Sequence, residues 1–328
     1  MIAHNRSPLL KGEKGMTIGR FGLFLGVLLC LGLSQVAAGG QATSPNGVSV
    51  HMVVTAETPH GYNPPAISRE DVIVYQGRDR DKVTDWVPAQ GDHAALELFV
   101  LIDDSSDTTL GSQLDDMRQS INAQPSTTKI GVAYMQNGNA QIVQNLTADH
   151  AAAAKALRLP LGVPGVNGSP YFSLADLIKR WPENGARHEV IMVSDGIDRF
   201  WGSGPDDPYV SSVIESAQRA GVLVFTIYTP GAGYYGHNYW HTWWGQIYLS
   251  RVSAETGGES YYMGFNGPPI SFVPFLDEIS HRLSNQYLLT FLPKPEKKAG
   301  MQRVKITTEV PKVELVAADQ VYVPASSE

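Results

Sequence analysis

The sequence predicts an α/β protein with a doubly wound, mostly parallel sheet that is flanked by helices. Between residues 96 and 283, apolar stretches of strand length alternate with amphipathic stretches of helix length. Two of the apolar stretches end directly on clusters of Asp and Ser, and Gly or Pro marks several of the connections. Because strand–helix–strand units place successive strands in parallel, these observations favour one open sheet.

The elements of this sheet can be assigned in order along the chain. Strands are expected at residues 96–102, 128–135, 140–144, 189–193, 222–228 and 260–263. Asn137-Gly138 is a hairpin signal, so the third of these strands should run antiparallel to the second. One helix should begin near Leu110, with Leu110, Leu114, Met117 and Ile121 on its apolar face. Further helices are expected at residues 149–157, 171–181, 210–220, 247–256 and 271–283.

Strand patterns without intervening helices flank this region on both sides. They occupy residues 48–55, 72–75 and 82–87 before it, and 287–291, 303–308 and 313–323 after it. We expect these two groups to pair in a small β module. The predicted organisation is a signal peptide at 1–38, an N-terminal β segment at 47–91, an α/β domain at 94–284 and a C-terminal β segment at 285–325.

The N-terminus has the pattern of a signal peptide. Lys11, Lys14 and Arg20 precede an apolar run at 21–33, and small residues at 36–38 offer a cleavage site. The protein is therefore expected to be exported, to the periplasm or outside the cell. The run is short for a membrane span, although an uncleaved anchor stays open as an alternative. Cys30, the only cysteine, would be removed when the signal peptide is cleaved, so the mature chain would have no disulfide. The net charge of −7 argues against a nucleic-acid partner.

Hard oxygen donors gather where two predicted strands end. The strand at 96–102 is followed by Asp103, Asp104, Ser105, Ser106 and Asp107, and the strand at 189–193 is followed by Ser194 and Asp195. Open α/β sheets bind ligands at the carboxyl ends of their strands. The two strand ends therefore predict one divalent-cation site, although Asp and Ser at helix N-termini also occur as simple caps.

This constellation resembles the von Willebrand factor A (VWFA) domain, and in particular the exported VWFA-related family of Acidobacteria. The metal-ion-dependent adhesion site of that family would correspond to 103–107, to Ser169 in GSPYFSLADL and to Asp195 in IMVSDGIDR. Thr229-Pro230, AETGG at 254–258 and NQYLLTFLP at 285–293 are also similar. The resemblance implies a VWFA, Rossmann-like fold and the metal ligands Asp103, Ser105, Asp107, Ser169 and Asp195.

Two positions depart from the family pattern, and the register of the motif is ambiguous. Asp107 stands where the family has Ser, and Ser169 stands where it has Thr. Asp104, Ser106 and Thr108 would satisfy the motif equally well. We prefer Asp103, because it follows the apolar strand directly. Asp104 and Asp198 are then expected to be solvated neighbours of the site.

The donor set suits Mg²⁺, or alternatively Mn²⁺ or Ca²⁺, because these cations prefer oxygen ligands. Incomplete coordination by the protein leaves a position for an acidic group of a partner. The resemblance thus implies adhesion or complex formation with a protein that exposes an Asp or Glu, and no enzymatic turnover. A metal-dependent hydrolase is an alternative from a different class, but no general base is evident.

An aromatic segment between Pro230 and Gly245 could contact a partner. It is expected to form a loop at the metal-binding edge, with Tyr235, Trp240, Trp243 and Trp244 as contact residues for a protein or a glycan. Two alternatives stay open: the rings are buried, or this segment (233–244) is the binding surface of a scaffold whose metal site is vestigial. His237 and His241 have a spacing suited to zinc on a helix, but the glycines nearby argue against a helix.

Overall fold

The computed structural model describes residues 48–163, 168–182, 184–202, 204–262, 271–294 and 298–325. The chain divides into two units, residues 1–43 and 44–328, and all described residues belong to the second. The predicted signal peptide, with Cys30, therefore lies outside the described residues. Within these ranges, no helix is both long enough and apolar enough to span a membrane.

The α/β class is confirmed by a six-stranded sheet in the order β6-β5-β4-β7-β8-β9. Neighbouring strands are parallel, except that β6 runs antiparallel to β5, as the hairpin signal indicated. The strand order changes direction between β4 and β7, which is the place where open α/β sheets bind ligands. The strands are β4 (Leu96–Asp103), β5 (Thr128–Gln136), β6 (Asn139–Thr147), β7 (Arg187–Ser194), β8 (Val222–Tyr228) and β9 (Ser260–Tyr261).

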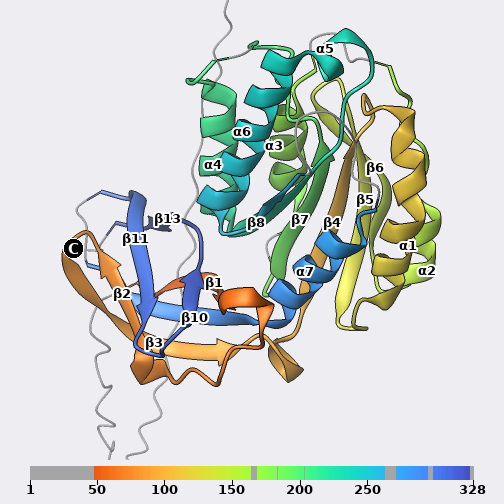
Figure 1. Ribbon diagram of the computed structural model, residues 1–328. Coiled ribbons are helices and arrows are strands. Elements are labelled where there is room, and N and C mark those ends of the chain that lie inside the picture. The colour runs from red at the N-terminus through yellow and green to blue at the C-terminus, as the bar shows by residue number, and fades with distance from the viewer. Residues whose placement is uncertain are drawn as a thin grey trace, which may run out of the picture. The chain divides into compact units, whose positions relative to one another are not determined.

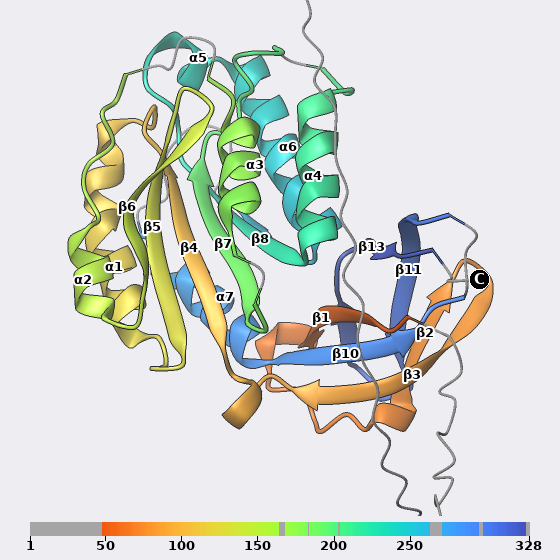
Figure 2. The same ribbon diagram turned by 180° about the vertical axis from the view of Figure 1, so that it is seen from behind.

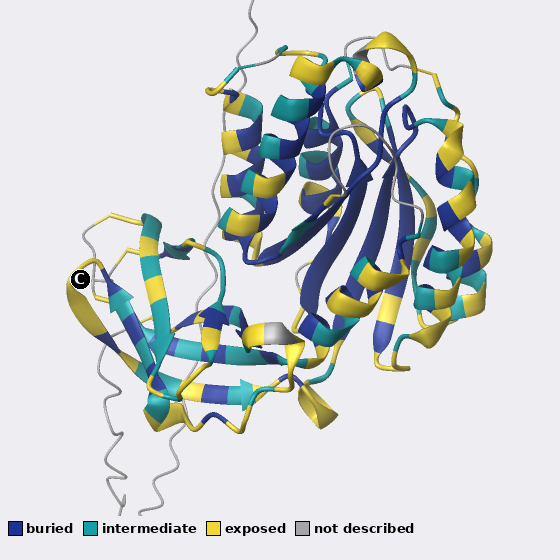
Figure 3. Ribbon diagram, viewed as in Figure 1, coloured by how far each residue is buried: buried dark blue, intermediate teal, exposed yellow. Residues whose placement is uncertain are grey.

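Helices cover both faces of this sheet (Figures 1 and 2). One face packs against α1 (Leu114–Ala123), α2 (His150–Lys155) and α7 (Val273–Ser284). The other face packs against α3 (Pro170–Arg180), α4 (Pro208–Ala220) and α6 (Tyr239–Thr256). β4, β7 and β8 are buried along their whole length, as Figure 3 shows, because side chains on both faces meet helices.

The N-terminal and C-terminal strands pair with each other, as expected. They form a seven-stranded antiparallel sheet in the order β12-β1-β10-β3-β2-β11-β13, with its own apolar core. β1 pairs with β10 over six residues, which joins the two ends of the chain. The strands are β1 (Val50–Glu57), β2 (Val72–Gln76), β3 (Asp79–Pro88), β10 (Gln286–Leu292), β11 (Gly300–Thr308), β12 (Glu314–Val316) and β13 (Gln320–Val323).

Short helical turns complete the described chain. The helix predicted from Leu110 begins as a 3₁₀ turn and becomes α-helical at Leu114. Its predicted apolar face is confirmed, since Leu110, Leu114, Met117 and Ile121 are all buried. The 3₁₀ turns are η1 (Pro59–Gly61), η2 (Arg69–Asp71), η3 (Gly91–His93) and η4 (Thr108–Gln113).

The prediction of an aromatic loop at 233–244 was wrong, because this segment is helical. It forms α5 (Gly233–His237) and the first turns of α6. Asn238 caps α6, and its side chain accepts hydrogen bonds from the backbone of Trp240 and His241. Gly245 does not break the helix. A Cβ there would lie 2.2 Å from the backbone oxygen of Asp195, so glycine lets α6 pass close to the site.

Candidate functional site at the carboxyl edge of the six-stranded sheet

The two strand ends predicted to form a site are adjacent. Asp103 is the last residue of β4, β7 ends at Ser194, and Asp195 follows it. The Ser194 hydroxyl donates a hydrogen bond to Oδ2 of Asp103 at 2.8 Å and accepts one from the backbone N–H of Gly196. Ser194 therefore ties the turn after β4 to the turn after β7, at the switch point of the sheet.

The turn after β4 is held by the carboxylate that ends the strand. The Ser105 backbone N–H and hydroxyl both donate to Oδ1 of Asp103, at 2.9 and 2.7 Å. The Ser106 backbone N–H donates to the Asp103 carbonyl. Asp103 is 5% exposed and Ser105 7%, so both oxygen donors have a fixed position at the edge.

Asp195 is fully engaged in the turn after β7. Its Oδ1 accepts a hydrogen bond from the Ile197 backbone N–H at 2.9 Å, and its Oδ2 pairs with the Arg199 guanidinium at 2.5 Å. Burial raises the pKa of Asp195 above its ordinary value, although Arg199 acts in the opposite direction. The carboxylate of Asp103 is close enough to raise this pKa further.

Ser169 also lies at this edge, directly before α3. Its hydroxyl donates to Oδ2 of Asp198 at 2.9 Å, and its side chain is buried. The Arg199 backbone N–H donates to the Gly168 carbonyl, which ties this segment to the turn after β7. The hydroxyl of Ser169 is therefore present beside the site but is directed to Asp198.

Asp107 is placed differently from the other predicted ligands. Its Oδ1 accepts a hydrogen bond from the Thr109 backbone N–H at 2.9 Å and caps η4. Its Oδ2 lies 3.9 Å from Nε2 of His237. That histidine ends α5 whereas His241 lies in α6, so the two histidines do not share the helix that a zinc pair would need.

Asp104 and Asp198 were expected to be solvated, and this was wrong. Asp104 is 4% exposed and pairs with both terminal nitrogens of Arg158, at 2.7 and 2.8 Å. Burial alone would raise its pKa, but hydrogen bonds from Arg158 and Gln136 outweigh burial and lower it. Asp198 is fully buried and accepts hydrogen bonds from the backbone of Phe200 and Trp201. Both aspartates are therefore structural members of the edge.

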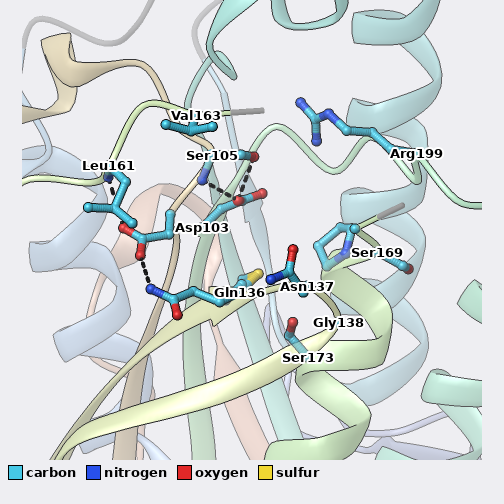
Figure 4. A pocket seen from close by; sticks show the side chains of 14 residues that line it. Asp103, Ser105, Gln136, Asn137, Gly138, Leu161, Val163, Ser169, Ser173 and Arg199 are labelled. Atoms are coloured by element: carbon cyan, nitrogen blue, oxygen red, sulfur yellow. Dashed lines mark hydrogen bonds between the residues drawn. The ribbon is translucent and has the colours of Figure 1, made fainter. Parts of the chain in front are cut away.

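A pocket of about 330 Å³ opens between these turns. Figure 4 shows that Asp103, Ser105 and Arg199 line one side of it, with Gln136, Asn137 and Ser173 below them. The Ser173 hydroxyl is buried and has no hydrogen-bond partner among the described residues. The lining residues are Asp103, Asp104, Ser105, Met135, Gln136, Asn137, Gly138, Leu161, Val163, Gly168, Ser169, Pro170, Ser173 and Arg199.

The charges at this edge do not balance. Asp103, Asp104, Asp195 and Asp198 are all buried, and the guanidinium groups paired with them are those of Arg158 and Arg199. The carboxylates of Asp103 and Asp198 are thus held by hydroxyl and backbone N–H donors, and neither is paired with a guanidinium group. Because buried charge is costly unless it is paired, this excess favours a cation at the edge.

The donor set suits a divalent cation in chemistry and in charge. Carboxylate and hydroxyl oxygens of Asp103, Ser105, Ser169 and Asp195 are hard ligands of the kind that Mg²⁺ prefers. No group of three or more His, Cys, Asp or Glu side chains within the described ranges has the arrangement of a metal site. The proposed set is of another kind, because it combines two carboxylates with hydroxyls. Two features oppose it, since Arg199 already pairs with Asp195 and the Ser169 hydroxyl is directed to Asp198.

Several residues of the edge were not predicted from the sequence. They are Arg158 and Arg199, which supply the two positive charges, and Ser173, which supplies a buried hydroxyl. The sequence held one indication that Arg199 belongs to the site, because Arg199 lies four residues after Asp195 in the same motif. It held none for Arg158, since Arg158 is brought to Asp104 by the fold across 54 residues.

The aromatic residues beside the edge differ in exposure. Tyr234, Tyr239 and Trp240 are 74%, 63% and 56% exposed, whereas Trp243 and Trp244 are half-buried. Trp244 stacks on Tyr248 with ring centroids 5.9 Å apart. The side chain of Tyr235 lies outside the described residues. Two further exposed aromatics, Phe200 and Trp201, follow Asp198 and were not predicted.

No family model matches the chain, and no curated protein matches it. Solved structures do align with it. BatB from Bacteroides thetaiotaomicron is 12% identical, covering 58% of this chain and 98% of its own, with a TM-score of 0.44. An aerotolerance-related membrane protein from Bacteroides fragilis is 11% identical, covering 58% and 98%, with a TM-score of 0.41. A von Willebrand factor type A protein from Catenulispora acidiphila is 10% identical, covering 88% and 76%, with a TM-score of 0.42. Likeness at this level carries no argument about family or function.

Proposed function

We propose that this is an exported binding protein of the VWFA type, which engages an acidic group of a partner protein through a divalent cation. The observation that carries the proposal is the excess negative charge at the switch point of the sheet. Four buried carboxylates meet two guanidinium groups there, beside a pocket open to a ligand. Sequence motifs in the order of the family support the same assignment.

Each residue of the donor set has a role in this proposal. Asp103 and Asp195 supply negative charge, while Ser105 and Ser169 supply hydroxyl oxygens. Asp107 joins the set only if its carboxylate leaves the N-terminus of η4. A bound Mg²⁺, Mn²⁺ or Ca²⁺ would offer an open coordination position to an Asp or Glu of the partner. Export is proposed from the signal-peptide pattern of residues 1–38, with a periplasmic or extracellular location.

A second candidate function is a scaffold that binds a protein or a glycan through its aromatic surface. The exposure of Tyr234, Tyr239 and Trp240 favours it, because exposed aromatic side chains are frequent in contact surfaces. Binding to envelope extract that survives a chelator would favour this candidate. Binding that is lost with the cation would favour the first.

The metal site can be tested by thermal denaturation. Adding Mg²⁺ or Mn²⁺ should raise the melting temperature, because a ligand that binds only the folded state stabilises it by mass action. At one hundred times the dissociation constant the gain is about 2.7 kcal/mol. Asp195→Asn should lose most of this gain, since it removes a negatively charged donor while keeping the shape of the side chain.

Asp206→Asn is the matched control for this experiment. Asp206 is exposed, so the variant changes net charge equally without touching the edge. It should keep the full response to the cation. An undiminished response in the Asp195 variant would remove Asp195 from the donor set, and no response in the unmodified protein would refute cation-held binding.

A further inference from the structure

The positively charged side chain of Arg199 already lies among the proposed metal ligands. This side chain is 7% exposed, and its two terminal nitrogens lie 2.5 and 3.4 Å from the oxygens of Asp195. Burial lowers its pKa, but the carboxylates of Asp195, Asp103 and Asp198 outweigh burial and raise it. One guanidinium therefore faces three carboxylates at the edge where the metal site is proposed.

The surrounding chain is shaped to accept this ion pair. Gly231 lies against it, and a Cβ at that position would be 2.0 Å from Oδ2 of Asp195 and 2.7 Å from a terminal nitrogen of Arg199. The Arg199 backbone is fixed by its hydrogen bond to Gly168. The pair is therefore built into the edge and is not a chance contact of a surface side chain.

The guanidinium is nevertheless incompletely satisfied. Its Nε is buried and has no hydrogen-bond partner among the described residues. Its remaining backbone contact, to the Ile197 carbonyl, is long at 3.5 Å. Because a guanidinium has five N–H donors, this geometry uses only part of them. Arg199 is therefore held at Asp195 mainly by electrostatic attraction to the carboxylates, since its hydrogen bonds are incomplete.

We propose that Arg199 competes with the divalent cation for Asp195, and that this competition lowers the affinity of the site for the cation. This inference rests on the metal site proposed above. A guanidinium and a divalent cation cannot share Oδ2 of Asp195, because like charges a few ångströms apart repel strongly in a buried site. Binding of the cation therefore requires Arg199 to leave Asp195. Without the cation, Arg199 compensates part of the buried charge and keeps the edge folded.

The competition can be measured by calorimetric titration of the purified protein with MnCl₂ and with MgCl₂. Arg199→Gln removes the competing charge, and its dissociation constant for Mn²⁺ should fall at least about tenfold. Arg199→Lys keeps the charge and should stay within about threefold of the unmodified protein. Circular dichroism without the cation reports whether each variant is folded.

Arg158→Gln is the matched control, since Arg158 holds the same charge in an ion pair with Asp104 at the same edge. Its affinity should change less than about threefold if Asp103 and Asp195 are the ligands. Equal affinity of Arg199→Gln and the unmodified protein would overturn the competition while leaving the metal site standing. Binding by neither protein would overturn both. Binding only by Arg199→Gln would support the competition and refute cation-held binding by the unmodified protein.

A second measurement covers the case in which Arg199→Gln does not fold. In the nitrogen-15 NMR spectrum of the unmodified protein, the Arg199 Nε–H signal is the arginine signal that Arg199→Lys lacks. It should shift as Mg²⁺ is added, at the concentrations that raise the melting temperature. A signal that stays in place while Mg²⁺ stabilises the protein would overturn the competition.

Discussion

Asp103 and Asp104 are adjacent in the chain, but their carboxylates have different surroundings. Asp103 accepts hydrogen bonds from the hydroxyls of Ser105 and Ser194, which are neutral. Asp104 is paired with Arg158 and also accepts from Gln136 and the Leu161 backbone. Of these two carboxylates, only that of Asp103 is not paired with a guanidinium group, which favours Asp103 over Asp104 as the first ligand.

This difference predicts the outcome of two substitutions. Asp103→Asn should abolish the rise in melting temperature caused by Mg²⁺, because it removes a carboxylate that is not paired with a guanidinium group. Asp104→Asn should keep that rise, although the variant itself should melt lower because Arg158 loses its partner. Each variant is compared with its own cation-free melting curve. The reverse pattern would show that Asp104, Ser106 and Thr108 form the true register.

At the scale of single residues, the sequence predicted where the aspartates lie in the fold better than it predicted their burial and their hydrogen-bond partners. The strand ends at Asp103 and Asp195 could be located, because an apolar run followed by a carboxylate is visible in one dimension. The burial of Asp104 and Asp198 could not, since it depends on Arg158 and on backbone N–H groups that the fold brings to them. The sequence alone does not show whether a polar residue after a strand is solvated or is buried against a partner.

At the scale of elements, the segment containing α5 and α6 shows where local patterns mislead. Gly236 and Gly245 suggested a loop, because glycine is unfavourable inside helices. In the structure each glycine lies where a side chain would clash. A Cβ at Gly236 would be 1.8 Å from the Gly231 carbonyl oxygen. Close approach of two backbones, which single-sequence patterns do not reveal, explains both residues.

The same segment predicts unequal effects of replacing its tryptophans. Trp240→Ser should change the free energy of unfolding by no more than about 0.5 kcal/mol, because the ring is largely exposed. Trp244→Ser should cost about 2 kcal/mol, since this half-buried ring stacks on Tyr248. Denaturant melts of the two variants measure the difference.

Trp201→Ser serves as the control, because Trp201 is 53% exposed and lies outside α5 and α6. It should behave like Trp240→Ser. Equal and large losses for Trp240 and Trp244 would mean that the whole aromatic segment is structural. The exposed part of it would then no longer support a partner-binding surface.

At the scale of the whole molecule, the alternation of strands and helices predicted the class, and the strand patterns without helices on either side of it predicted the pairing of the two chain ends. Both follow from hydrophobic periodicity, which reports burial directly. The order of the seven-stranded sheet could not be predicted, because β10 lies between β1 and β3 in the sheet although it follows β3 in the sequence by about 200 residues, and periodicity does not report such long-range pairing.

A buried polar cluster joins the two sheets, and it predicts how stability depends on pH. Glu189 in β7 is completely buried, 3.9 Å from the guanidinium of Arg187. Arg187 in turn donates to the Leu283 carbonyl at the end of α7 and to the side chain of Gln286 in β10. Burial raises the pKa of Glu189 to about 7, with Arg187 acting in the opposite direction.

Because this pKa is raised in the folded state, the stability linked to Glu189 is fully present below its ordinary pKa of 4.5 and is lost as pH rises to about 7. Glu189→Gln cannot ionise, so it should be more stable than the unmodified protein at pH 8, by at most about 3 kcal/mol. At pH 4.5 the two should unfold alike, since Glu189 is then protonated and similar in shape to Gln. Urea melts across this range measure the difference. A variant less stable than the unmodified protein at pH 8 would mean that Glu189 is ionised there and that its ion pair with Arg187 outweighs the cost of burial.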